Sequence, residues 1–376
     1  MRVVGMLYLA FSTCISAQEL VFSAKVMGPV SNIATYSDKG EIKRVTDNIR
    51  WRDMDADISS SGAVVFSSNR EENTAVDINR RSESFDIYLA AGSGAPLRRL
   101  TDTPQSESIP RFSPGGHRVA YVQERNTLWL QELEGSDLEV NSAEKLFSAE
   151  EVLDFDWSPD GSHLAVAVRD EASSKLLLLG LGEAGDVAAK TLQVFPRNES
   201  DAESDCARCG SVVSIRWSPD QRQIALILHP ERHGVRSLWR MPVEVTTASG
   251  DENIVRVSSV GQQVQSPVNW SSDGQSLLYS ALVNYRFYYD ESVQRKVYEG
   301  GMQVFRTQPG SEPVSLTSAE GAAKSPVFFG REKIAYLQAD GLGARTYALV
   351  IHHLGDGSTQ RVFDQVSGKS SLTVSR

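Results

Sequence analysis

The sequence predicts an all-β protein whose sheets form a closed ring, a β-propeller. Three observations predict this fold class. A short aromatic-Ser-Pro-Asp-Gly phrase recurs along the chain, the copies lie about 45 to 60 residues apart, and the segments between them resemble short strands. The chain has 376 residues, 40% of them hydrophobic, so it can bury the core that such a ring needs.

The recurring phrase has four clear copies and two weaker ones. The clear copies begin at Arg111, Trp157, Trp217 and Trp270, and the weaker ones span residues 58–66 and 328–336. Proline presets φ, aspartate bonds back to the backbone, and glycine takes a positive φ, so these residues form a tight turn. An aromatic residue ends the strand before the turn and an aliphatic run follows it. Each copy therefore encodes a β-hairpin.

Two further β-like runs follow each hairpin. Asp86–Leu89 and Leu97–Thr101 follow the first weak copy, and Thr127–Leu130 and Lys145–Phe147 follow the first clear copy. The runs are too short for ordinary helices and rich in residues that favour strands. Four strands per unit is the composition of a propeller blade.

The two ends of the chain decide the expected number of blades. Leu20–Ala24, Asn32–Tyr36 and Ile42–Thr46 resemble the last three strands of a unit that lacks its first strand. Ser371–Ser375 is a single β-like segment after the sixth unit. If this segment supplies the missing strand, N- and C-terminal strands close a seven-bladed ring with no open edge. The alternative is a six-bladed ring with the N-terminal segment packed outside.

The first 17 residues have the layout of a secretory signal peptide. Met1-Arg2 supplies a positive charge, Val3–Phe11 is apolar, and small residues lead to a cleavage site after Ala17. A lipoprotein acylated at Cys14 is an alternative. No later apolar run is long enough to cross a membrane. We therefore expect a signal peptide at 1–17, a propeller at 18–376, and a periplasmic or secreted location.

The composition excludes several classes of protein. Lys and Arg total 38 against 48 Asp and Glu, a formal net charge of −10. Binding to nucleic acid requires a cationic surface that this balance does not supply. The sequence also lacks a P-loop, a Rossmann glycine fingerprint and an HExxH zinc motif. No catalytic residue can be named from spacing.

Cys206 and Cys209 form the most distinctive local motif. In an exported protein a CxxC pair favours a local disulfide. A redox-active dithiol is a second possibility, although the lowered thiol pKa that it needs has no visible source here. A third is a Cys2His2 zinc site with His229 and His233. In a blade, the loop entering the first strand and the loop joining the second and third strands emerge on one face, so these residues could converge.

Asp53, Asp55 and Asp57 alternate along one predicted strand, so they are expected to share one face. Such oxygens could hold Ca²⁺ in the central channel. The alternative is a solvated acidic strand that lines the channel mouth. Apart from these zinc and calcium alternatives, no cofactor is expected.

A group of aromatic residues, Tyr285, Phe287, Tyr288 and Tyr289, falls in the long connection of the fifth unit. Such a connection could contact a peptide or a glycan. The alternative is an extended hairpin that packs on its own blade.

The repeat phrase resembles that of the TolB-like propeller family, a WD40-like group also called PD40. The closest stretch is 57–130, which contains Val65-Phe66-Ser67-Ser68-Asn69-Arg70 and the first clear copy. The resemblance implies a propeller over nearly all of 20–376. TolB itself has an α/β domain ahead of its propeller, and here strands begin directly after the signal. Prolyl-oligopeptidase-like hydrolases share the repeats but need a Gly-x-Ser-x-Gly elbow, which this sequence lacks.

These observations lead to two functional hypotheses. The first is a periplasmic, non-catalytic, monomeric scaffold that binds a protein or cell-envelope component through one face or the channel mouth. The second is an exported enzyme, a metal-dependent lyase or hydrolase acting on polysaccharide at the central channel. The second requires several histidines and carboxylates to converge from different blades, and the chain has 6 histidines.

Overall fold

Strands make up the regular structure of the described residues, as the repeated phrase and the short β-like runs predict. The computed structural model describes residues 18–70, 84–135, 138–182, 187–196, 209–230, 235–244, 254–292, 294–308 and 310–375. Within these ranges the regular elements are strands β1 to β28, and no helix occurs. The signal peptide expected at 1–17 lies outside the described residues.

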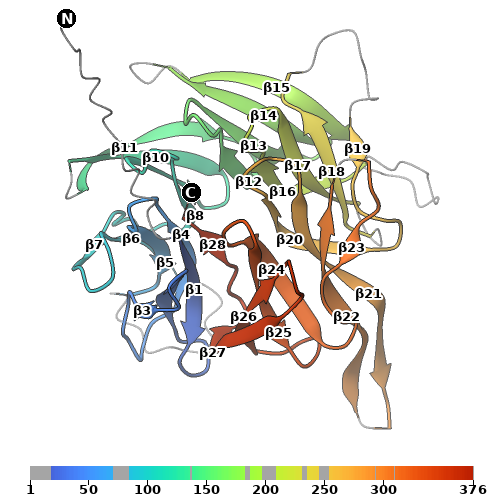
Figure 1. Cartoon of the computed structure of the whole chain (residues 1–376). Helices are drawn as coiled ribbons and strands as arrows, with labels where there is room; N and C mark the ends of the chain where they lie inside the picture. Colours follow the sequence, from blue (N-terminus) through green and yellow to red (C-terminus); the bar gives the residue numbers. More distant parts are fainter. Residues whose placement is uncertain are drawn as a thin grey trace, which may run out of the picture.

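Four separate four-stranded sheets stand around a common centre (Figure 1). The first comprises β4 (Asp53–Ile58), β5 (Val64–Ser68), β6 (Asp86–Ala90) and β7 (Leu97–Arg99). The second comprises β8 (Glu107–Phe112), β9 (Arg118–Gln123), β10 (Thr127–Glu134) and β11 (Glu139–Ser148). The third comprises β12 (Glu151–Trp157), β13 (His163–Arg169), β14 (Ser173–Leu181) and β15 (Val187–Pro196). The fourth comprises β16 (Ser211–Trp217), β17 (Gln223–His229), β18 (Ser237–Pro242) and β19 (Val255–Arg256).

The remaining strands join in one twelve-stranded sheet. It begins with β20 (Gln263–Trp270), β21 (Leu277–Asp290), β22 (Arg295–Thr307) and β23 (Val314–Ser315). It continues with β24 (Ala322–Phe328), β25 (Lys333–Ala339), β26 (Thr346–His353) and β27 (Thr359–Ser367). It ends with β1 (Glu19–Lys25), β2 (Ser31–Ser37), β3 (Ile42–Arg44) and β28 (Thr373–Val374). The structure therefore has four separate sheets and one large mixed sheet in place of the seven separate blades that the sequence predicts.

Two narrow junctions connect the parts of the large sheet. One residue pair, Met302 with Ala322, links β22 to β24, and another, Ala24 with Val366, links β27 to β1. Neighbouring strands within each part instead share long ladders, such as the seven pairs between β1 and β2. The large sheet is therefore continuous only through single bridges.

The predicted turns form as their residue types require. In the second clear copy, Asp160 Oδ1 accepts hydrogen bonds from Ser158 Oγ at 2.6 Å and from the Ser162 N–H at 3.0 Å. These bonds lower the pKa of Asp160 to about 2. Gly161 adopts φ 71°, the left-handed conformation that glycine tolerates best. The local phrase thus fixes the hairpin between β12 and β13.

The hydrophobic core lies between neighbouring sheets. One cluster brings Ala165 and Leu176 of the third sheet against Ile215, Trp217 and Leu226 of the fourth. The aromatic residue before each turn is central to this packing, and Trp157 is 1% exposed. Sheets that bury both faces against neighbours in this way account for the long apolar strands.

The two ends of the described chain pair with each other. Leu20 of β1 lies opposite Val374 of β28, and Val21 lies opposite Thr373. The Ser375 N–H also donates to the Glu19 carbonyl oxygen at 2.8 Å. The segment expected to complete the N-terminal unit is therefore paired as the sequence predicts.

Candidate functional site

A cavity of about 1510 Å³ follows the centre of the ring. One strand from each of the six hairpin units lines it, together with β28 and with residues of β22 and β26. These inner strands are β4, β8, β12, β16, β20 and β24. One end is bordered by the turns of the repeat, including Pro114, Pro159 and Pro219. We call this end the channel mouth.

Each of these six inner strands has a register shift, near its middle, in its pairing with the next strand of its unit. The shifts fall between Met54 and Asp57, Ser108 and Arg111, Val152 and Asp154, Val212 and Ser214, Gln265 and Asn269, and Lys324 and Val327. Such bulges bend a strand and re-aim its side chains. The channel wall is therefore not a set of simply alternating residues.

This bulge corrects the prediction that Asp53, Asp55 and Asp57 share one face. Asp55 takes φ 52°, which breaks the alternation. Asp55 and Asp57 line the channel, whereas Asp53 is completely buried away from it. Burial raises the pKa of Asp55, and the positive charges of Arg111 and Lys369 oppose this effect. The three carboxylates do not form one calcium-like group.

Polar side chains of the inner strands bond one unit to the next. An oxygen just before the turn accepts the backbone N–H of the following inner strand. These pairs are Asp57 with Phe112 at 2.8 Å, Asp156 with Trp217 at 2.8 Å, and Asn269 with Phe328 at 3.0 Å. Hydrogen bonds to a carboxylate are among the stronger ones in proteins. They hold neighbouring units in register around the channel.

Asp154 is the most heavily bonded carboxylate of the wall. Its oxygens accept bonds from Arg111 Nη2 at 2.6 Å, from Arg216 Nη1 at 3.0 Å and from the Ile215 N–H at 2.9 Å. The Asp154 side chain is 7% exposed, and the three inner strands β8, β12 and β16 meet there. The sequence did not predict this cluster. Its one visible sign is a charged residue, Asp or Arg, two positions before the serine of each of the first four turns.

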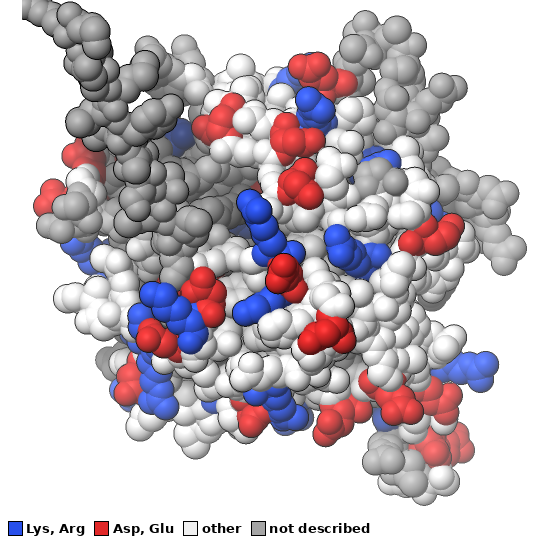
Figure 2. All heavy atoms as spheres, viewed as in Figure 1, with Lys and Arg blue, Asp and Glu red and all other residues white. Residues whose placement is uncertain are grey.

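Other cations lie further along the channel. Lys324 donates from Nζ to the Gly368 carbonyl oxygen at 2.6 Å, and its Nζ lies 4.7 Å from the ring centre of Tyr347. Burial lowers the pKa of Lys324 to about 8. Arg331 and Lys369 also line the cavity and are exposed. Figure 2 shows basic and acidic side chains interspersed on one face of the molecule.

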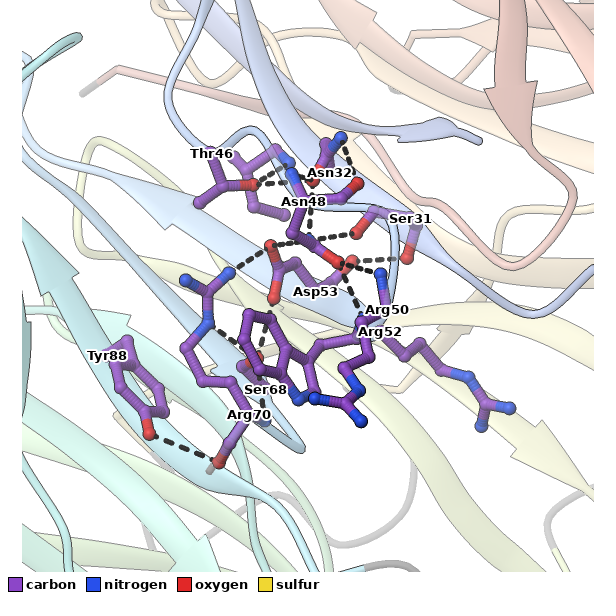
Figure 3. A network of polar contacts seen from close by, with 12 residues as sticks. Ser31, Asn32, Thr46, Asn48, Arg50, Arg52, Asp53, Ser68, Arg70 and Tyr88 are labelled. Carbon is purple, nitrogen blue, oxygen red and sulfur yellow. Dashed lines mark hydrogen bonds and ion pairs between the residues drawn. The ribbon is translucent and has the colours of Figure 1, made fainter. Parts of the chain in front are cut away.

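Asp53 is the centre of a separate buried network (Figure 3). It accepts hydrogen bonds from Arg70 Nη2 at 2.5 Å, Ser68 Oγ at 2.6 Å and Asn48 Nδ2 at 3.0 Å. The Arg70 guanidinium lies 5.4 to 5.6 Å from three aromatic ring centres, those of Trp51, Phe66 and Tyr88. Because Asn48 precedes β4 and Ser68 ends β5, the network anchors the start of the first sheet.

Glu107 occupies the corresponding position at the start of β8, with neutral partners. Its oxygens accept bonds from Thr101 Oγ1 at 3.0 Å, Thr103 Oγ1 at 2.6 Å and Gln123 Nε2 at 2.9 Å. Burial raises the pKa of Glu107 in spite of these bonds. Strands β4 and β8 therefore each begin at a buried carboxylate. The partners of Asp53 include the cation of Arg70, whereas those of Glu107 are all neutral.

The predicted cysteine site is only partly described. Cys209 is buried and takes part in a disulfide. Cys206 and His233 lie outside the described residues, so the Cys206–Cys209 disulfide and the zinc alternative both stay predictions. Cys209 does lie beside the end of β17, because a Cβ on Gly210 would be 2.3 Å from the His229 carbonyl oxygen. Among the described residues, no three His, Cys, Asp or Glu gather as a metal-binding group.

The predicted aromatic cluster lies on a strand. Tyr285, Phe287, Tyr288 and Tyr289 belong to β21, which forms an extended hairpin with β22. The alternative expectation is confirmed in part, because the extended hairpin is present. Its packing on its own blade is not, because these rings are between 38% and 57% exposed.

Comparison with known proteins identifies the fold. No family model and no curated protein matches the chain. Among solved structures, the chain is similar to the β-propeller domain of the Trilobed protease from Pyrococcus furiosus, with 10% identity and a TM-score of 0.57. That match covers 93% of this chain and 95% of the other. At this identity the likeness shows a β-propeller fold and nothing about activity.

Two further structures share the arrangement. A candidate 6-phosphogluconolactonase from Bacteroides uniformis is 13% identical, with a TM-score of 0.60 over 96% of this chain and 99% of the other. TolB from Acinetobacter baumannii is 12% identical, with a TM-score of 0.50 over 95% of this chain and 82% of the other. The described residues contain no helix long and apolar enough to cross a membrane.

Proposed function

We propose that the chain is an exported, non-catalytic β-propeller scaffold that binds a protein or cell-envelope component at the channel mouth. Export rests on the signal-like residues 1–17, with cleavage near Ala17. A periplasmic or secreted location follows from the same segment. The binding role rests on the geometry of the channel.

We further propose that the ring has seven blades. The large sheet then consists of three blades, β20–β23, β24–β27, and β28 with β1–β3, which touch through single residue pairs. In the third of these blades β28 supplies the strand that the N-terminal segment lacks. This arrangement leaves no open edge at the two ends of the chain.

The observation that carries the binding role is the bonding of the channel wall. Asp57, Asp154 and Asp156 already accept hydrogen bonds from the neighbouring inner strand. These carboxylates therefore hold the blades together, and the wall is fixed before any ligand arrives. A preformed site binds more tightly because little ordering is left to do on association. Exposed groups such as Arg331 and Lys369 then remain at the cavity to contact a ligand.

Site-specific crosslinking tests this proposal. A photoreactive amino acid at Lys369, in the channel, should form a defined adduct with an envelope component in the native host. The same amino acid at Lys39, exposed on the β2–β3 turn, is the matched control and should not form that adduct. The double variant Arg331→Glu/Lys369→Glu should reduce the adduct formed from a third channel position, Ser272.

The adduct also separates the alternatives. Recovery of peptidoglycan-associated lipoprotein or peptidoglycan would favour a role similar to that of the Tol system. Equal labelling from Lys39 and Lys369 would contradict binding at the channel. Cleavage of a polysaccharide by the purified protein, abolished by Asp55→Asn, would support the enzyme hypothesis instead.

A further inference from the structure

The hairpin of β21 and β22 extends beyond its sheet (Figure 1). Strand β20 pairs with β21 only up to Leu282, whereas β22 continues to pair with β21 as far as Asp290. Residues 284–290 of β21 and 295–300 of β22 therefore form a two-stranded ribbon, which we call the arm. In Figure 1 it projects from the body as the longest hairpin of the view.

The base of the arm depends on two adjacent glycines. The β21–β22 pairing shifts between Val283 and Arg286, and Asn284 takes φ 52°. Gly300 takes φ 90°, and a Cβ there would lie 2.5 Å from the Asn284 carbonyl oxygen. A Cβ on Gly301 would lie 2.0 Å from the Ala319 carbonyl oxygen. The sequence thus specifies where the ribbon leaves the sheet.

One face of the arm is aromatic. Phe287 lies opposite Tyr298 with ring centres 5.3 Å apart, and Tyr289 lies opposite Lys296, whose Nζ is 5.7 Å from the Phe287 ring centre. Phe287 is 49% exposed, Tyr289 57% and Tyr298 45%. The other face is polar: Arg286 lies opposite Glu299, and Glu299 accepts a hydrogen bond from Tyr288. Exposed aromatic groups of this kind mark interaction surfaces.

The outer edge of β21 is open along the arm. Among the described residues, the only strand paired with 284–290 is β22. An exposed edge without proline is a template for pairing with another strand. A two-stranded ribbon is also only marginally stable by itself in water, so a third strand would stabilise it.

We propose that a second copy of this chain pairs with this edge. The two β21 strands would run antiparallel about a twofold axis at Phe287, so that the two arms form one four-stranded sheet. Phe287 would face its own counterpart, Tyr285 the partner copy's Tyr289, Arg286 its Tyr288, and Asn284 its Asp290. The aromatic faces of both arms then form one continuous surface.

The residue types along this edge favour a second copy as the occupant. In the proposed register no two like charges face each other, and aromatic residues face aromatic residues. Residues 284–300 contain three basic and three acidic residues, whereas the whole chain carries a net charge of −10. Because the arm carries no net charge, contact between two arms would not add to the electrostatic repulsion between two acidic chains. A dimer of this kind would differ from the monomer expected from the sequence.

A charge-swap experiment tests the pairing. Wild type should sediment as a dimer whose fraction rises with concentration. Phe287→Lys and Phe287→Glu should each sediment as monomers, because like charges then meet at the twofold axis. An equimolar mixture of the two variants should return to dimers. Val314→Lys, on the exposed β23 of the same unit, is the matched control and should dimerise like wild type.

Several outcomes would overturn the proposal. Wild type that stays monomeric at every concentration would do so, as would mixed variants that fail to reassociate while their circular dichroism matches wild type. Monomeric wild type that co-sediments with peptidoglycan sacculi, with loss of this binding in Phe287→Lys, would assign the arm to a glycan instead. None of these results depends on what binds at the channel.

Discussion

Two buried carboxylates stand at the same place in neighbouring sheets and are satisfied differently. Asp53 begins β4 and pairs with the cation of Arg70, whereas Glu107 begins β8 and is bonded by Thr103, Gln123 and a second threonine. Both residues are 0% exposed. The comparison shows that β4 and β8 both begin at a buried carboxylate, and that only one of the two carboxylates is balanced by a cation. The consequences of removing each acid should therefore differ in size and in pH dependence.

The largest expected effect comes from breaking the charged network. Asp53→Ala leaves Arg70 buried among aromatic rings without its carboxylate. Removing one partner of a buried ion pair costs about 3–5 kcal/mol. Urea denaturation at neutral pH, followed by circular dichroism, measures the loss in free energy of unfolding.

Asp47→Ala is the matched control for this variant. Asp47 also pairs with an arginine, Arg44, but its side chain is 77% exposed. An exposed pair contributes about 0–1 kcal/mol, so this variant should unfold close to wild type. Equal losses for the two variants would mean that burial does not set the strength of the Asp53 pair.

A smaller effect is expected when both charges are removed together. Arg70→Met keeps apolar contact with the aromatic rings, and Asp53→Asn keeps an acceptor for Ser68 and Asn48. The double variant should lose less than the sum of the two single variants, with a coupling of about 1–3 kcal/mol. A double-mutant cycle in urea measures this value. Strict additivity would show that the two side chains act independently.

The smallest effect is expected at Glu107, and its pH dependence has a defined sign. The pKa of Glu107 is raised above its ordinary value of 4.5, so stability is lost as pH rises through the folded-state pKa. Glu107→Gln removes this loss and should change stability at neutral pH by only about 1 kcal/mol. Between pH 4 and pH 7 the variant should gain stability relative to wild type. A constant difference across this range would contradict a raised pKa.

Local patterns were predictable because their causes are local. The turn at Ser158-Pro159-Asp160-Gly161 and the hairpin it forms depend on four residues and their own hydrogen bonds. The aromatic residues of β21 were expected in a long connection, with an extended hairpin as the alternative. The exposure of that strand could not be predicted, because it depends on which other segments fail to cover it.

The channel wall was not predictable from one strand. Asp154 meets Arg111 and Arg216, which lie 43 and 62 residues away in sequence, so the cluster exists only once three sheets are assembled. The failure at Asp53, Asp55 and Asp57 has a different cause. The bulge at Asp55 is a backbone conformation, and an Asp-x-Asp-x-Asp pattern carries no sign of it. The first gap therefore comes from packing between units, and the second from a backbone conformation within one unit.

The pairing of β1 with β28 sets an order of events during synthesis. The bond between Glu19 and Ser375 joins residues 356 positions apart, so β1 waits for its last neighbour until translation has delivered the end of the chain. Contacts this distant in sequence slow the final stage of folding. The pairing of β1 with β28 therefore cannot form until residues 373–375 have been synthesised. Such a delay would suit the export that we propose, because a secretion channel accepts unfolded polypeptide.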